Sequence, residues 1–146
     1  MLVRELMTDD VITVPRDTTV RTAVRTMLEE RVGSVIVVEG AVPVGIFTGT
    51  DALGVAYECD CPFSAIGVEE GMSDDLVTGS PDMTVRSAAR TLTEHGIEKL
   101  PIVADMDLVG ILTLNDIVRE HATLLKEAYG LDVRRRKWTF EGDDDD

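Results

Sequence analysis

Two threonine–aspartate pairs with the same spacing are the residues of this chain whose chemistry best suits a small polar ligand. Thr48 and Asp51 lie in the segment 45–51 (Gly-Ile-Phe-Thr-Gly-Thr-Asp), and Thr113 and Asp116 in the segment 110–116 (Gly-Ile-Leu-Thr-Leu-Asn-Asp). A carboxylate offers acceptor oxygens to two neighbouring hydroxyl groups, and a helix N-terminus offers unpaired N–H groups to an anion. The same spacing is close to a capping box, in which the threonine and the acid satisfy the first N–H groups of their own helix. Spacing alone leaves both interpretations open.

The two pairs belong to an internal duplication with an offset of 65 residues. Residues 3–53 align with residues 68–118 without a gap, and 20 of the 51 aligned positions are identical. A unit of about 50 residues buries too little of its own surface to fold well alone, so we expect the two copies to pack against each other and share a core. We expect a first repeat at 3–57, a linker at 58–67, a second repeat at 68–129 and a tail at 130–146. The tail carries the basic run 134–137, and its last residues are expected to be disordered.

The first copy predicts a strand, a helix, two strands and a second helix. The first strand spans 11–14 and is closed by Pro15. The first helix spans 20–31, ends at Gly33, and buries one face at helical spacing, made by Val20, Ala23, Val24, Met27 and Leu28. The β-branched run 34–38 predicts a central strand. It is followed by a strand at 42–47 and a helix that begins within 48–51 and ends near Tyr57.

The second copy predicts the same order of elements. We expect a strand at 75–78, a helix whose apolar positions run from Val85 to Leu92 and which ends at Gly96, and a hairpin of 100–103 with 108–112. The final helix begins at Asn115 and extends to Tyr129. Both copies therefore mix helices and strands, which indicates an α+β fold.

The charge balance limits the kinds of partner. The chain has 28 acidic and 14 basic residues and a net charge of −14. Such a charge repels itself at ordinary ionic strength but is largely screened at molar salt, where the Debye length is ~3 Å. We interpret it as halophile-like adaptation to a salt-rich cytoplasm; the alternative is an ordinary soluble protein with an acidic tail. Binding to nucleic acid is not expected, because it needs basic surface. Without a signal peptide or an apolar run of ~20 residues, we expect a cytoplasmic protein that does not enter a membrane.

The cysteines and histidines give no sign of a metal site or of catalysis. Cys59 and Cys61 are too close in sequence for an unstrained structural disulfide, so we expect free thiols, and a structural zinc site needs four ligands. His95 falls at a helix end and His121 on an apolar helix face, where we expect a core residue. No arrangement of nucleophile and base stands out. We therefore expect no metal and no catalytic residue.

The repeated segment, the Leu100–Val103 strand and the duplication together resemble a tandem cystathionine-β-synthase (CBS) domain pair, often called a Bateman module. The resemblance covers about residues 3–120. It implies two strand-helix-strand-strand-helix repeats packed as a pseudo-twofold pair. It also implies a module without enzymatic activity, which binds adenine nucleotides or related adenosyl compounds in clefts between the repeats.

The resemblance implies roles for particular residues. The aspartates Asp51 and Asp116 would accept hydrogen bonds from the ribose hydroxyls, and Thr48 and Thr113 would contact phosphate. Arg119, one helical turn past Asp116, would reach phosphate or be a solvated helix arginine. If one site alone is occupied, we expect it to be the one containing Asp116. The remaining candidate lining residues lie on strands. Beside the second cleft they are Lys99, Leu100 and Pro101, and in the strands that precede the first helix of each copy they are Thr13, Val14, Thr78 and Gly79.

The expected function is the sensing of an adenosyl ligand, with AMP, ADP, ATP, S-adenosylmethionine and a dinucleotide all left open. Occupancy would be passed to an unidentified effector protein or to the protein's own oligomer. Modules of this kind pair into flat homodimers through their helices, here 116–129 and 20–31, in a parallel or antiparallel manner. The competing interpretation is a scaffold or oligomerisation module whose clefts are empty or vestigial.

Overall fold

Residues 1–129 are described by the computed structural model, which has an α+β fold built from two repeats. The elements of the first half are α1 (Val3–Leu6), β1 (Thr13–Pro15), α2 (Val20–Glu30), β2 (Ser34–Glu39), β3 (Val42–Thr48) and α3 (Gly49–Cys59). Two short 3-10 turns, Phe63–Ala65 and Val68–Glu70, lead to the second half, which holds α4 (Val85–His95), β4 (Lys99–Ala104), β5 (Asp107–Thr113) and α5 (Leu114–Tyr129). The expectations for the tail fall outside the described residues.

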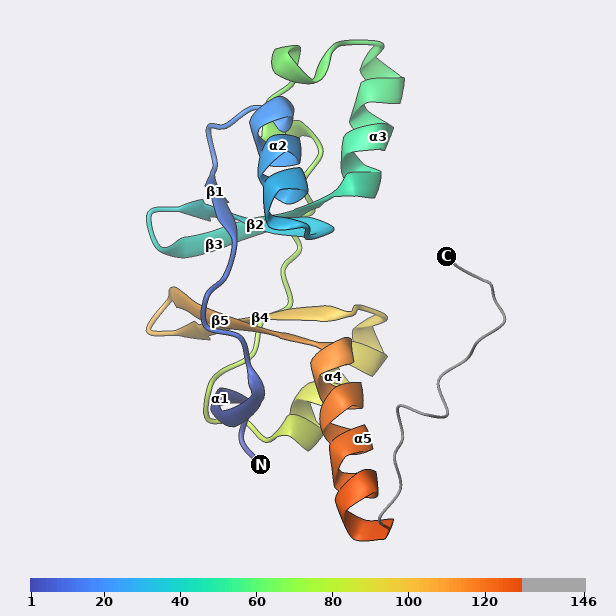
Figure 1. Cartoon of the computed structure of the whole chain (residues 1–146). Helices are drawn as coiled ribbons and strands as arrows, with labels where there is room; N and C mark the ends of the chain where they lie inside the picture. Colours follow the sequence, from blue (N-terminus) through green and yellow to red (C-terminus); the bar gives the residue numbers. More distant parts are fainter. Residues whose placement is uncertain (130–146) are drawn as a thin grey trace, which may run out of the picture.

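The two sheets lie at the centre of the molecule and the helices lie on the outer sides (Figure 1). In the first repeat the strand order is β1-β2-β3, with β2 central as its β-branched run predicts. The second repeat forms the hairpin β4-β5. Helices α2 and α3 cover the outer side of the first sheet, and α4 and α5 cover that of the second (Figure 1). The arrangement confirms the expected pseudo-twofold pair of repeats.

Local sequence explains where the first helix of each repeat begins and ends. The hydroxyl of Thr19 accepts a hydrogen bond from the N–H of Thr22 at 3.1 Å, which caps α2, and Thr84 caps α4 in the same way. Helix α2 ends where Arg31 adopts a left-handed conformation with φ 59°, so the prediction that Gly33 ends it is wrong. The prediction that Leu28 is buried is also wrong, since its side chain is 74% exposed.

The segment that leads into each repeat packs against the other repeat. Val3 lies in the core of the second repeat with Leu92, and Val68 lies in the core of the first repeat with Phe47. The expectation of one shared core is therefore replaced by two cores, each completed by a segment from the other half. This exchange gives each small unit additional apolar surface to bury.

The exchanged segments cross directly over a glycine in the last strand of each sheet. Ser73 forms a bridge with Ile46, and Thr8 forms the equivalent bridge with Ile111. A Cβ atom at Gly45 would lie 2.6 Å from the sulfur of Met72, and one at Gly110 would lie 2.6 Å from the sulfur of Met7. The glycine in each repeated segment is thus explained by the close approach of a crossing chain.

Exposed ion pairs join the same crossings. Arg4 of the first lead-in pairs with Asp82, and Glu69 of the second lead-in pairs with Arg16, which also contacts Glu39. The hydrogen bond from Arg16 to Glu69 raises the pKa of the Arg16 guanidinium above its ordinary value. Pairs this exposed contribute little to stability, so we expect the crossings to depend mainly on buried side chains such as Val3 and Val68 and on the backbone hydrogen bonds that the lead-in segments make.

The strand predicted at 75–78 is absent, although its counterpart β1 forms. In the first repeat the N–H of Ile36 donates to the carbonyl of Ile12 at 3.2 Å. The equivalent of Ile36 is Pro101, which has no N–H to donate to Val77. The pairing is therefore reduced to one parallel bridge between Gly79 and Ile102. The strand predicted at 11–14 is present but shifted to Thr13–Pro15.

Two further expectations are corrected by side-chain placement. Cys59 and Cys61 form a disulfide with a Cα–Cα distance of 5.1 Å, so the free thiols expected from their spacing are not seen. His121 is exposed, because it lies on the outer face of α5 rather than in the core. Among residues 1–129 no helix combines the length and the apolar character that crossing a membrane requires.

Candidate ligand-binding clefts

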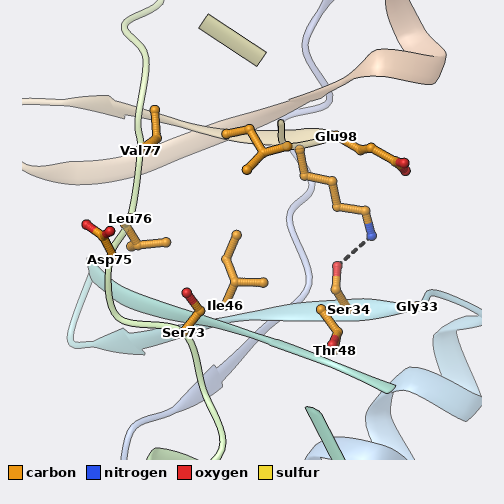
Figure 2. A pocket seen from close by; sticks show the side chains of 11 residues that line it. Gly33, Ser34, Ile46, Thr48, Ser73, Asp75, Leu76, Val77 and Glu98 are labelled. Atoms are coloured by element: carbon orange, nitrogen blue, oxygen red, sulfur yellow. Dashed lines mark hydrogen bonds between the residues drawn. The ribbon is translucent and has the colours of Figure 1, made fainter. Parts of the chain in front are cut away.

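Two clefts lie between the repeats. The first, which we call the Thr48 cleft, has a volume of about 380 Å³ and is lined by Gly33, Ser34, Ile46, Thr48, Ser73, Asp75, Leu76, Val77, Ile97, Glu98 and Lys99 (Figure 2). The second, the Thr113 cleft, has a volume of about 210 Å³ and is lined by Thr8, Asp10, Val11, Ile12, Val32, Ser34, Ile36, Lys99, Ile111 and Thr113. Pockets for small molecules usually span ~300–1,000 Å³, so the Thr48 cleft reaches that range by itself, whereas the Thr113 cleft reaches it only together with the adjoining groove. A groove of about 450 Å³ next to Thr113 and Lys99 adjoins the smaller cleft.

Each cleft is assembled from both repeats. The Thr48 cleft takes Thr48 and Ile46 from the first repeat and Val77 and Ile97 from the second. The Thr113 cleft has the equivalent residues with the repeats exchanged. The cause is the crossing of the lead-in segments, since Ser73 pairs with Ile46 and so carries residues 75–77 to the edge of the first sheet.

The predicted lining residues are divided between the clefts and the cores. Thr48, Thr113 and Lys99 line clefts. The other predicted strand residues do not contribute to the described lining of either cleft. Val14 and Leu100 are core residues, Pro101 is buried, Gly79 packs closely on Met83, and Thr13 and Thr78 are exposed.

Both aspartates close a capping box. The N–H of Thr48 donates to Oδ2 of Asp51 at 2.9 Å, and the N–H of Asp51 donates to Oγ1 of Thr48 at 3.0 Å. Thr113 and Asp116 make the same two bonds at 2.9 and 3.1 Å. Neither aspartate is part of the described lining of the clefts. The local capping role is therefore present in both repeats, and a ligand would share the carboxylate with it.

The two carboxylates differ in what their second oxygen contacts. Nη2 of Arg119 donates to Oδ1 of Asp116 at 2.5 Å, and the carboxylate of Asp116 is almost fully buried. The equivalent of Arg119 in the first repeat is Gly54, and Asp51 makes no ion pair within residues 1–129. Arg119, expected to reach phosphate or solvent, thus contacts the aspartate, although its side chain is 69% exposed.

Ser34 is a lining residue that the sequence did not single out. Nζ of Lys99 donates to Oγ of Ser34 at 2.5 Å, the dashed bond in Figure 2. Both residues line both clefts. The acidic lining residues Asp10 and Asp75 were also missed, although the repeat of Asp-Asp at 9–10 and 74–75 was a visible signal.

The clefts offer polar groups for a ligand but no metal centre. The Thr48 cleft combines an apolar wall of Ile46, Val77 and Ile97 with the hydroxyl of Thr48 and the ammonium of Lys99. Within the described residues, no group of three or more His, Cys, Asp or Glu side chains is arranged to hold a metal ion. The arrangement can hold a ligand with an apolar ring and an anionic group.

Comparisons with known proteins agree with the observed fold. A family model described as CBS domain matches residues 3–58 and 65–123. The CBS domain-containing protein YhcV of Bacillus subtilis is 35% identical over 115 residues, which covers 79% of this chain and 81% of YhcV. The crystal structure of a putative acetoin utilization protein, AcuB of Vibrio cholerae, has a TM-score of 0.78 and 27% identity, covering 90% of this chain and 98% of that one. The structure of CBSX2 in complex with AMP has a TM-score of 0.74 and 27% identity, with 85% and 98% coverage.

Proposed function

The chain belongs to the CBS domain family as a tandem pair, and from this premise we propose that it is a regulatory module without catalytic activity that binds an adenosyl ligand between its repeats. The observation that carries the proposal is that each cleft is built from both repeats. A ligand held by both repeats favours whichever arrangement of the repeats gives it more contacts. Occupancy is thereby converted into a change that an oligomer or an effector protein can read.

The lining of the Thr48 cleft supports an adenine nucleotide or a related adenosyl compound. Its apolar wall suits a purine ring, and the hydroxyl of Thr48 and the ammonium of Lys99 suit a phosphate. AMP bound to CBSX2 supports the same class. AMP, ADP, ATP and S-adenosylmethionine are the candidates.

We place the main site in the Thr48 cleft, although the sequence favours the cleft containing Asp116. The volume of the Thr48 cleft, about 380 Å³, exceeds the volume of about 210 Å³ of the Thr113 cleft without the adjoining groove. Oδ2 of Asp51 holds the cap, while Oδ1 has no ion-pair partner within residues 1–129 and is the better acceptor for a ribose hydroxyl. Asp116 already uses one oxygen for the cap and the other for Arg119.

The exposed apolar side chains support a homodimer formed through the helices. Leu28, Leu53 and Tyr57 on α2 and α3 are 74%, 69% and 87% exposed, and Val118 and Leu124 on α5 are 55% and 52% exposed. An apolar groove between α2 and α3 lies beside Leu28 and Leu53. An apolar groove flanked by exposed apolar side chains suits a protein–protein contact, and a second copy would present the same helices in return.

A thermal-shift screen tests the binding proposal. A ligand that binds the folded state alone raises the Tm, and saturation at about 100 times the dissociation constant adds about 2.7 kcal/mol. We expect AMP or one of ADP, ATP, S-adenosylmethionine and NAD to raise the Tm in high-KCl buffer. The shift should be lost in Asp51→Ala and kept in Asp116→Ala.

The outcomes separate a sensor from a scaffold. If no ligand shifts the wild type at millimolar concentration while both aspartate variants melt earlier, the capping boxes are purely structural and the scaffold interpretation holds. If the shift is lost in Asp116→Ala instead, the site lies in the Thr113 cleft. Release of phosphate from ATP by the pure protein would contradict the absence of catalysis.

A further inference from the structure

Lys99 and Ser34 occupy equivalent positions of the duplication, and their side chains meet. They are 65 positions apart, which is the offset of the repeat, and Nζ of Lys99 lies 2.5 Å from Oγ of Ser34. Equivalent residues of two repeats can contact each other only near the axis that relates the repeats. The ammonium of Lys99 therefore lies close to the pseudo-twofold axis, with one cleft on each side of it.

The same ammonium is the basic group of both clefts. Lys99 lines the Thr48 cleft and the Thr113 cleft, and no other Lys or Arg among residues 1–129 belongs to the described lining of either. The other charged lining residues are acidic, Asp75 and Glu98 in the first cleft and Asp10 in the second. A phosphate in either cleft would be repelled by these carboxylates unless Lys99 faced it.

We propose that Lys99 is a single phosphate-binding cation shared by the two clefts, so that a phosphorylated ligand in one cleft weakens the binding of a phosphorylated ligand in the other. The inference rests on the proposed function, because it concerns the ligands of the same clefts. The ammonium has three donors but one charge, so a second phosphate meets a cation already neutralised by the first. An uncharged adenosyl ligand in the second cleft avoids this penalty, and mixed occupancy by one nucleotide and one nucleoside is favoured.

The test isolates each cleft and then removes the cation. Ser73→Trp fills the Thr48 cleft and Thr8→Trp fills the Thr113 cleft, at equivalent exposed lining positions. AMP and adenosine are titrated by calorimetry into each single-cleft protein, with and without Lys99→Gln. The glutamine amide can still donate to Ser34 but carries no charge. We expect Lys99→Gln to weaken AMP by about 10-fold in both single-cleft proteins, as for a charged hydrogen bond, and to change adenosine binding little.

A second measurement is made without the cleft-filling tryptophan substitutions. The methyl groups of Ile46 and Ile111 line different clefts at equivalent positions, so methyl NMR of the intact protein follows each cleft separately. For each ligand we compare the dissociation constant of the second molecule with that of the first. This ratio should be about 10-fold larger for AMP than for adenosine. Ser34→Lys, which gives each cleft its own cation, should remove this difference, and the exchange Ser34→Lys with Lys99→Ser should restore it.

The outcomes distinguish the two proposals. If neither AMP nor adenosine binds, this inference fails, and the proposed function fails as well only if ADP, ATP and S-adenosylmethionine also leave the Tm unchanged. If both bind but Lys99→Gln weakens AMP in one single-cleft protein alone, Lys99 belongs to that cleft and the shared-cation inference is overturned while the proposed function stands. The inference is also overturned if, in the wild type, the ratio of the second to the first dissociation constant is the same for AMP and for adenosine.

Discussion

The two repeats contain the same threonine–aspartate capping box, but they differ in whether the second carboxylate oxygen of the aspartate is available to a ligand. In both, the aspartate closes a capping box with bonds of nearly equal length. In the second repeat, Arg119 occupies the remaining oxygen of Asp116, whereas the first repeat has Gly54 at that position. A repeated motif therefore fixes the local helix start in both copies, while a residue one turn away decides whether the carboxylate can also serve a ligand.

A similar contrast separates the strands that precede the helices. Ile36 pairs with Ile12 and supports β1, while Pro101 cannot pair with Val77 and leaves that segment as a single bridge. The larger cleft lies against the unpaired segment. The loss of one backbone donor therefore accompanies a difference between the walls of the two clefts.

The largest expected effect contrasts the two aspartates in the ligand-free protein. Asp116→Ala removes the acidic half of the capping box and a hydrogen-bonded ion pair at a buried position, and should lower the free energy of unfolding by about 2 kcal/mol. Asp51→Ala removes only the acidic half of the capping box and should lower it by about 1 kcal/mol. Urea denaturation followed by circular dichroism measures both. Equal losses would show that the contact between Asp116 and Arg119 adds nothing to the free energy of unfolding.

The helix ends provide a smaller contrast. Arg31 and Gly96 are equivalent and both are left-handed, with φ 59° and 62°. Because glycine adopts this conformation without a Cβ penalty, Arg31→Gly should raise the free energy of unfolding by about 1 kcal/mol, and Gly96→Ala should lower it by about 1 kcal/mol. Gly33→Ala is the matched control, since its Cβ would meet no atom within 4 Å and its φ is not left-handed. A neutral Arg31→Gly would mean that the arginine side chain offsets the backbone cost.

The smallest effect on stability is expected from single substitutions at the equivalent positions Arg119 and Gly54. Arg119→Ala removes an exposed guanidinium and should change the free energy of unfolding by about 0.5 kcal/mol. It also frees Oδ1 of Asp116, so AMP should bind the Thr113 cleft about fivefold more tightly, as for one added hydrogen bond. Gly54→Arg, placed where nothing lies within 4 Å, should weaken AMP in the Thr48 cleft. Calorimetry that finds weaker binding after Arg119→Ala would instead assign Arg119 to phosphate.

Local patterns in the sequence predicted most of the elements. The central strand β2 and the end of α4 at Gly96 depend on neighbouring residues along the chain, and the structure confirms them. The capping boxes at Thr48 and Thr113 were one of the two interpretations that the spacing left open, and both boxes are present. The failures have non-local causes. The missing strand at 75–78 depends on Pro101 more than 20 positions away, and the exposure of Leu28 depends on which helix faces are left uncovered by the rest of the chain.

The candidate site was predictable in part for the same reason. Thr48, Thr113 and Lys99 follow from the repeated motif and the family resemblance, and all three line clefts. Ser34 was visible only as the counterpart of Lys99 in the duplication and was not predicted to line a cleft, because its role comes from its contact with Lys99. Val14 and Leu100 were expected in the lining, but their side chains point into the two cores.

The sequence by itself determined that the chain is a duplication, which elements each copy contains and which residues are equivalent. Equivalent residues are found by aligning the sequence with itself at a constant offset, which requires no three-dimensional structure. The tertiary structure alone decided which residues are neighbours. Because the lead-in segments cross, each threonine faces the opposite repeat. Because Lys99 and Ser34 lie near the axis that relates the repeats, two residues 65 positions apart come into hydrogen-bonding contact between the clefts.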